Sequence, residues 1–111
     1  MTIKEYQTAA QRTSNKELSK GEHLINGALG LCGEAGEVAD LVKKAFMQGH
    51  IIDREHIAKE IGDCCWYIVE AAVAIGYDLE EIMQMNIDKL KARYPDGFDP
   101  EKSMHRAIGD L

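Results

Sequence analysis

Hydrophobic positions along this chain recur every three or four residues, which is the spacing of a helix face and not of a strand. The pattern predicts a short amphipathic helix over residues 2–14, followed by a polar loop over residues 14–22. The longest helix is predicted from His23 to about Met47. It carries apolar residues on two sides, so we expect more than one neighbouring helix or subunit to cover it.

A third helix is predicted after the glycine-containing stop at residues 48–50. Asp53 is placed to cap its first turn, and Gly76 is placed to end it. Its apolar positions alternate in steps of three and four, as they do along the seam of a helical bundle. We expect this seam to comprise Ile57, Ile61, Cys64, Ile68, Ala71 and Ile75.

A fourth helix is predicted to begin at residues 78–81 and to end at Pro95, which cannot continue a helix. Residues 95–100 indicate a turn, and a last short helix is expected over residues 100–108. The whole pattern predicts an all-α fold, a bundle of about four main helices in one domain over residues 1–111. The second and third helices should lie at its centre.

Composition fits this fold and limits the partners. Hydrophobic residues make up 45% of the chain and charged residues 29%, with only 2 prolines. The formal net charge of −6 repels nucleic acid backbones and anionic membranes, so neither is an expected partner. The amino terminus has no apolar signal segment, and we expect a cytoplasmic protein. Three cysteines without CxxC spacing are expected to be small buried residues: Cys32, Cys64 and Cys65.

Two acidic motifs carry the candidate chemistry. Glu34 and Glu37 lie on the second helix, and Glu60 and Asp63 lie on the third. Residues three apart project to the same side of a helix, so antiparallel packing would bring four carboxylates together. Without compensation these groups would repel one another, whereas Mg²⁺ prefers such an all-oxygen site. The motifs therefore predict metal binding.

Glycines recur every third residue around the first acidic motif, at positions 27, 30, 33 and 36. Each costs about 1 kcal/mol relative to alanine inside a helix. We expect a neighbouring helix or a ligand to approach the backbone closely there.

Two other interpretations of the acids are weaker. A solvated helix face would not place the acids beside apolar seams, and a di-iron bundle requires Glu-x-x-His motifs, which this chain lacks. The histidines have no ligand spacing and are interpreted as surface or loop residues: His23, His50, His56 and His105.

A basic group follows on the fourth helix, where Asn86, Lys89 and Arg93 are spaced to share one side. Opposite a metal-loaded acidic cluster, this side could hold a polyphosphate or the sugar and base of a nucleotide. Lys43 and Lys44 could join it, although cations near a helix end are equally explained by the helix dipole.

Tyr67 shares a helix face with Asp63 and could stack on a nucleobase, although aromatic residues on a central helix more often belong to the core. Trp66 lies further round the helix and is the weaker candidate.

Three segments together resemble the MazG-type nucleotide pyrophosphohydrolases of the all-α NTP pyrophosphatase superfamily. They are ALGLCGEAGEVADLVKK, KEIGDCCWYI and NIDKLKARYPDGF, and the resemblance covers residues 24–98. It carries the family's Glu-x-x-Glu, spacer and Glu-x-x-Asp pattern on Glu34, Glu37, Glu60 and Asp63.

The resemblance implies Mg²⁺-dependent hydrolysis of nucleoside or deoxynucleoside triphosphates between the α and β phosphates, with Mn²⁺ as a possible substitute. The four acids would then bind metal and act in catalysis, with Glu37 or Glu34 positioning or deprotonating water. Asn86 and Lys89 match family positions that contact the nucleotide. The resemblance also implies a homodimer or homotetramer and a role in cleaning the nucleotide pool.

Two alternatives stay open. One is a relative of dUTPase or of phosphoribosyl-ATP pyrophosphatase, which shares the acidic helices but differs around them. The other is a helical nucleotide-binding or regulatory module without turnover. Loss of activity on removing one acid would distinguish an enzyme from such a module.

Overall fold

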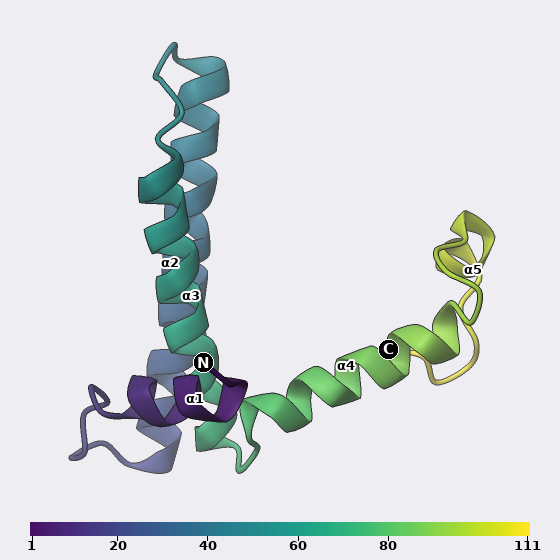
Figure 1. Ribbon diagram of the computed structural model, residues 1–111, viewed down its shortest axis with the longest axis horizontal. Coiled ribbons are helices and arrows are strands. Elements are labelled where there is room, and N and C mark those ends of the chain that lie inside the picture. Colours follow the sequence, from purple (N-terminus) through teal and green to yellow (C-terminus); the bar gives the residue numbers. More distant parts are fainter. The chain divides into compact units, whose positions relative to one another are not determined.

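The computed structural model describes all residues, 1–111, and contains helices without any strand (Figure 1). The helices are α1 (Ile3–Gln11), α2 (Lys20–Met47), α3 (Arg54–Ala74), α4 (Leu79–Arg93) and α5 (Pro100–Met104). This confirms the all-α prediction with four main helices. The chain forms two compact units, residues 1–79 and 80–111, and each is described by itself.

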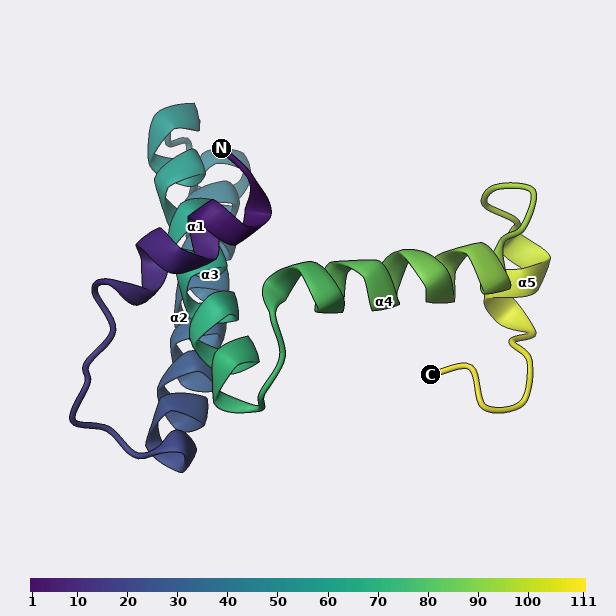
Figure 2. The ribbon, with the colours of Figure 1, turned by 60° about the horizontal axis from the view of Figure 1, so that its bottom comes forward.

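Helices α2 and α3 form an antiparallel pair that is the frame of the first unit (Figures 1 and 2). The two backbones approach closely at Gly27, where an added Cβ would lie 2.7 Å from the backbone nitrogen of Ala71. One turn further along α2, a Cβ on Gly30 would clash with the ring of Tyr67. The predicted close approach is therefore confirmed at two of the four glycines, while Gly33 and Gly36 face open space.

Helix α2 begins earlier than predicted, at Lys20 instead of His23. Ser19 and Glu22 form a reciprocal capping box in which each side chain accepts a hydrogen bond from the other residue's backbone N–H. The Ser-x-x-Glu signal was present in the sequence and places the helix start inside the segment we expected to be a loop.

The other helix ends follow recognisable caps. Asp53 caps α3 as predicted, accepting a hydrogen bond from the backbone N–H of His56 at 3.0 Å. Gly76, with φ of +84°, lies just beyond the end of α3 in the left-handed region that glycine favours. Helix α5 is shorter than expected and ends at Met104 instead of continuing to Ile108.

The core of the first unit lies where α1 packs across α3. Ala10, Val69 and Leu79 are buried there, and Ile3 and Trp66 are among the half-buried residues packed against them. Gln7 on α1 links this core to Leu79, because its side-chain oxygen accepts a hydrogen bond from the backbone N–H of Leu79 at 2.7 Å.

Part of the predicted core is exposed within one chain. Ile61 on α3 is 51% exposed, Ile75 directly after α3 is 54% exposed, and Cys32 on α2 is exposed as well. These buried-residue predictions are wrong for the isolated chain, because α3 packs mainly against α2 and to a lesser extent against α1, and both helices of the pair keep an exposed side.

Glu70 is a buried carboxylate with a complete set of partners. Ser14 donates a hydrogen bond to it at 2.6 Å, Asn26 donates another at 2.9 Å, and the Nδ1 atom of His23 lies 3.2 Å away. His23 is therefore half-buried in a polar network, and its interpretation as a surface or loop residue is wrong. The network ties the loop before α2 to both long helices.

The second unit consists of α4, the following turn and α5. Tyr94 and Phe98 pack with ring centroids 5.4 Å apart, and Gly97 takes a φ of +93° in the turn between them. After α5 the chain turns back toward the end of α4 (Figure 2), where Arg93 pairs with Asp110. No helix in the chain is long and apolar enough to cross a lipid bilayer.

The crossing of α2 and α3 can be tested with Gly27→Ala. The new methyl group would meet the backbone of Ala71, so we expect a loss of about 1–3 kcal/mol in the free energy of unfolding measured by urea denaturation. Gly21→Ala is the matched control, because nothing lies within 4 Å of that position in the same helix. Equal stability of the two variants would contradict the close crossing.

The Glu70 network predicts acid sensitivity. Burial raises the pKa of Glu70, but the hydrogen bonds from Ser14, Asn26 and His23 outweigh burial and hold it below the ordinary value of 4.5. Its contribution to stability is therefore complete above that value and is lost as the pH falls through the lower, folded-state pKa.

We expect Glu70→Gln to lower the free energy of unfolding at pH 7 by about 1–3 kcal/mol. The variant should also show a weaker pH dependence of thermal stability below pH about 5 than the unsubstituted chain. Parallel pH profiles for the two proteins would argue against an ionised Glu70 in the fold.

Candidate functional site

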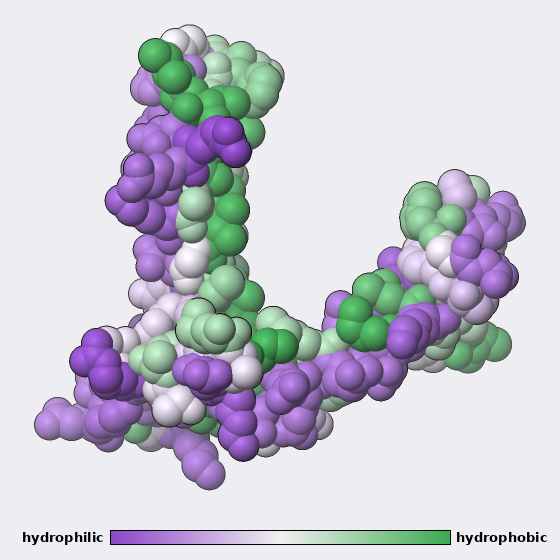
Figure 3. Space-filling view, in the orientation of Figure 1, coloured by the Kyte–Doolittle hydropathy of each residue, from purple (hydrophilic) through white to green (hydrophobic).

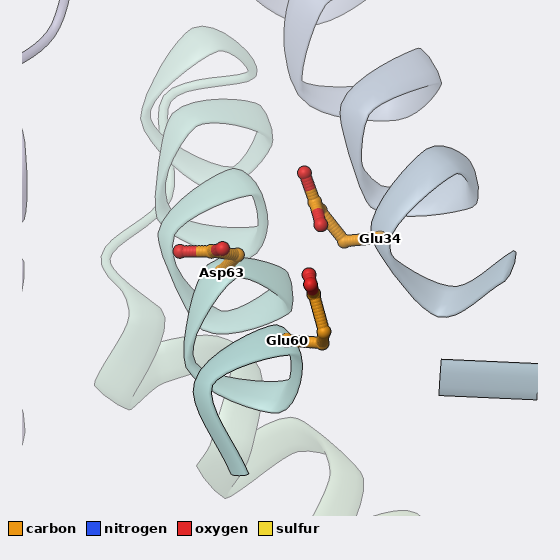
Figure 4. Close-up of side chains that lie close together, drawn as sticks. All are labelled: Glu34, Glu60 and Asp63. Carbon is orange, nitrogen blue, oxygen red and sulfur yellow. The ribbon is translucent and has the colours of Figure 1, made fainter. Parts of the chain in front are cut away.

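Three of the predicted acids come together between α2 and α3. Figure 4 shows Glu34 extending from α2 toward Glu60 and Asp63 on α3. One ligand atom from each residue lies within 4.8 Å of the others. Glu34 and Glu60 are half-buried, whereas Asp63 is exposed, so the cluster opens to solvent at one side.

Glu37 does not join this group, although we expected four converging carboxylates. It is exposed on α2, while Glu34 is half-buried. Residues three apart are offset by about 60° around a helix, so the two members of one motif need not reach the same point. The charge of Glu37 still acts on the cluster, because it contributes to the raised pKa of Glu34.

The neighbouring acids raise the pKa of Glu34. Its pKa is raised above the ordinary value, first by a hydrogen bond with Glu60 and then by partial burial and the charges of Glu60 and Asp63. A hydrogen bond between two carboxyl groups requires that one of them carries a proton. Without a cation, the cluster therefore binds a proton more readily than separate carboxyl groups would.

His56 is a neighbour of the cluster that our sequence analysis missed. Its Nε2 atom lies 3.0 Å from the Oε1 atom of Glu60, one turn along α3. The His-x-x-x-Glu spacing could have revealed this pair, because residues four apart meet on a helix surface. The contact restricts the orientation of the Glu60 carboxylate.

A depression of about 390 Å³ lies beside the acids, lined by Thr13, Glu34, Asp63, Trp66 and Tyr67. Tyr67 was expected there, but Trp66 was expected to lie further round the helix. The two rings pack edge to face with centroids 5.1 Å apart, so both contribute to the wall. The indole N–H of Trp66 donates to the Thr13 hydroxyl at 2.8 Å and to the carbonyl of Ala10 at 2.9 Å.

The predicted basic residues either pair with a carboxylate within the first unit or belong to the second unit. Lys44 lies 2.7 Å from Asp40, and Lys43 lies 3.7 Å from the same carboxylate. Asn86, Lys89 and Arg93 all lie on α4 in the second unit. Asn86 and Lys89 are exposed, whereas Arg93 is half-buried in an ion pair with Asp110.

The donor set fits a hard divalent cation. Glu34, Glu60 and Asp63 offer only oxygen atoms, and Mg²⁺ or Mn²⁺ binds carboxylate oxygens with water completing the coordination. The elevated pKa of Glu34 is a sign of the same crowding, which a bound cation would relieve.

Comparison with known proteins identifies the family of the chain. The model of the MazG nucleotide pyrophosphohydrolase domain matches residues 23–98, which include the acidic cluster, Tyr67 and all of α4. The chain is also similar to the Gene 37 protein of Mycobacterium phage L5, with 32% identity over 101 residues, covering 84% of this chain and 89% of the phage protein. No solved structure matches the chain. The match over residues 23–98 shows that this chain belongs to the MazG nucleotide pyrophosphohydrolase family.

Proposed function

We propose that this protein is a divalent-metal-dependent nucleoside triphosphate pyrophosphohydrolase. It would cleave nucleoside or deoxynucleoside triphosphates between the α and β phosphates, giving a monophosphate and pyrophosphate. The observation that carries the proposal is the convergence of Glu34, Glu60 and Asp63 beside an aromatic-walled depression. Membership of the family supplies the class of reaction.

Glu34, Glu60 and Asp63 would hold Mg²⁺, or Mn²⁺ in its place, with Glu37 at the exposed edge of the site. The cation would neutralise triphosphate charge and lower the pKa of a bound water. Such chemistry needs mainly positioning and charge stabilisation from the protein. A chain with a net charge of −6 could in this way accept a polyanionic substrate.

The residues of the chain have separate roles in this proposal. Glu37 or Glu34, the two acids of the motif on α2, would position or deprotonate the attacking water. Tyr67 and Trp66 offer aromatic surfaces to a base or sugar in the depression. Asn86 and Lys89 on α4 would contact the nucleotide, as their match to family positions implies. Lys44 and Arg93 are weaker candidates, since carboxylates of the chain already pair with them.

We also propose a homodimer or homotetramer. Large apolar side chains remain exposed on α2, among them Ile25 at 59%, Leu29 at 68% and Phe46 at 73%. Figure 3 shows apolar residues along one edge of the α2–α3 pair. A second copy could cover this edge and bury the residues that the sequence analysis assigned to the core.

The broader assignments extend the same proposal. We place residues 1–111 in one functional domain, because the family match continues through both compact units. The cellular role would be the cleaning of the nucleotide pool in the cytoplasm.

The reaction can be tested by separating products on anion exchange after incubation with a panel of NTPs and dNTPs. We expect a monophosphate and pyrophosphate with Mg²⁺ and no turnover with EDTA. Glu34→Gln and Glu60→Gln should each lower kcat by about 10²-fold or more, because each removes a metal ligand or the base.

Glu55→Gln is the matched control for these variants. Glu55 lies in the first turn of α3, the helix that also carries Glu60, and it is not one of the acids of the cluster. Its side chain is 81% exposed and forms an ion pair with Lys59. It should keep full activity. Release of orthophosphate instead of pyrophosphate would contradict α–β cleavage, and metal-bound protein without turnover would favour the regulatory module.

The oligomer can be tested by size-exclusion chromatography with light scattering. We expect a mass of two or four times 12.4 kDa at micromolar concentration. Leu29→Asp should shift the protein toward the monomer, because a charge on the covered edge is costly to bury. Thr8→Asp at an exposed position of α1 is the control, because it adds the same single negative charge. A monomeric mass for the unsubstituted chain would contradict the proposal.

A further inference from the structure

His56 lies beside the acidic cluster and has no role in the proposed reaction. Its Nε2 atom is 3.0 Å from the Oε1 atom of Glu60, which is within hydrogen-bond range. An ionised carboxylate can only accept, so the ring donates its Nε2–H proton to this oxygen. The contact comes from α3 itself, whereas Glu34 extends toward Glu60 from α2 (Figure 4). Glu60 is therefore held from its own helix.

A second pair in the chain has the same spacing and a different environment. His105 and Glu101 are also four residues apart, but their side-chain atoms are 3.4 Å apart and the Glu101 side chain is 71% exposed. Such a solvated pair contributes little. The Glu60 side chain is only 16% exposed, so water competes less for its oxygens. The His56 contact is therefore the more restrictive of the two.

The orientation of Glu60 matters because glutamate is a flexible ligand. Its side chain has several rotatable bonds, and fixing them costs conformational entropy. A hydrogen bond that already holds the carboxylate reduces the part of this cost that falls on metal binding. An ionised carboxylate has acceptor sites for both an N–H donor and a cation, so the two contacts are compatible at Glu60.

We propose that His56 is a positioning residue of the metal site, whose hydrogen bond orients the Glu60 carboxylate for a divalent cation. The proposal rests on the proposed function, because it takes Glu60 as a metal ligand. His56 acts through Glu60 and need not touch the cation or the nucleotide. Removal of a hydrogen-bond partner of a metal ligand typically lowers metal affinity or activity by about 10- to 100-fold.

The test is isothermal titration calorimetry of the full chain with Mn²⁺ in the absence of nucleotide. His56→Leu should weaken Mn²⁺ binding by about tenfold or more, because it removes the hydrogen-bond donor. His56→Gln should restore most of the affinity, because its amide N–H can donate to a carboxylate one turn away. Neither variant removes the cap of α3, since Asp53 accepts from the backbone N–H of residue 56.

His105→Leu is the matched control, because it breaks a pair of the same spacing outside the cluster. It should leave the Mn²⁺ affinity unchanged. Thermal unfolding of each variant in EDTA measures the effect on stability separately. A lower melting temperature of His56→Leu with unchanged Mn²⁺ affinity would assign the pair to helix stability alone and overturn the proposal.

Equal weakening by His56→Leu and His56→Gln would also overturn it, because donation to Glu60 would then not be the cause. So would the absence of Mn²⁺ binding by the unsubstituted chain. The titration requires no turnover, so its outcome is separate from that of the proposed hydrolysis. Mn²⁺ binding that depends on His56, in a chain that hydrolyses no nucleotide, would support the positioning role and contradict the proposed reaction.

Discussion

The close crossing of α2 and α3 at Gly27 and Gly30 is the constraint on which the first unit depends. The absence of a side chain at Gly27 lets the helix backbones approach, and the space at Gly30 receives the ring of Tyr67. This contact sets the register of the antiparallel pair, and the register places Glu34 opposite Glu60 and Asp63. The position of the acids is therefore a consequence of the crossing.

The same packing makes the acidic cluster unfavourable without a counter-charge. Glu34 sits close enough to Glu60 to share a hydrogen bond, and its pKa rises because nearby charge disfavours ionisation. The fold stabilises the arrangement elsewhere, with the Glu70 network on the same helices and the core between α1 and α3. Repulsion within such a site lowers the folding stability of the metal-free protein, and the same repulsion raises its affinity for a cation.

The sequence predicts local features well and long-range placement less well. Helical spacing and the Asp53 cap predicted α3, because both signals lie within a few residues of one another. The two acidic motifs, each only four residues long, indicated which acids form the cluster. Exclusion of Glu37 depends on rotation about the helix axis, and the Arg93–Asp110 pair joins residues from different segments. Such contacts follow from the fold and leave no periodic signal. Exposure of Ile61 likewise depends on what packs beside the chain.

Trp66 connects the amino-terminal helix to the wall of the candidate site. Its indole N–H donates to groups at the end of α1, while its ring lines the depression beside Asp63 and Tyr67. It is also the single tryptophan of the chain. The protein thus carries one indole fluorophore, which can be excited selectively over the tyrosines, and its emission reports on the depression and on the docking of α1 without any added label.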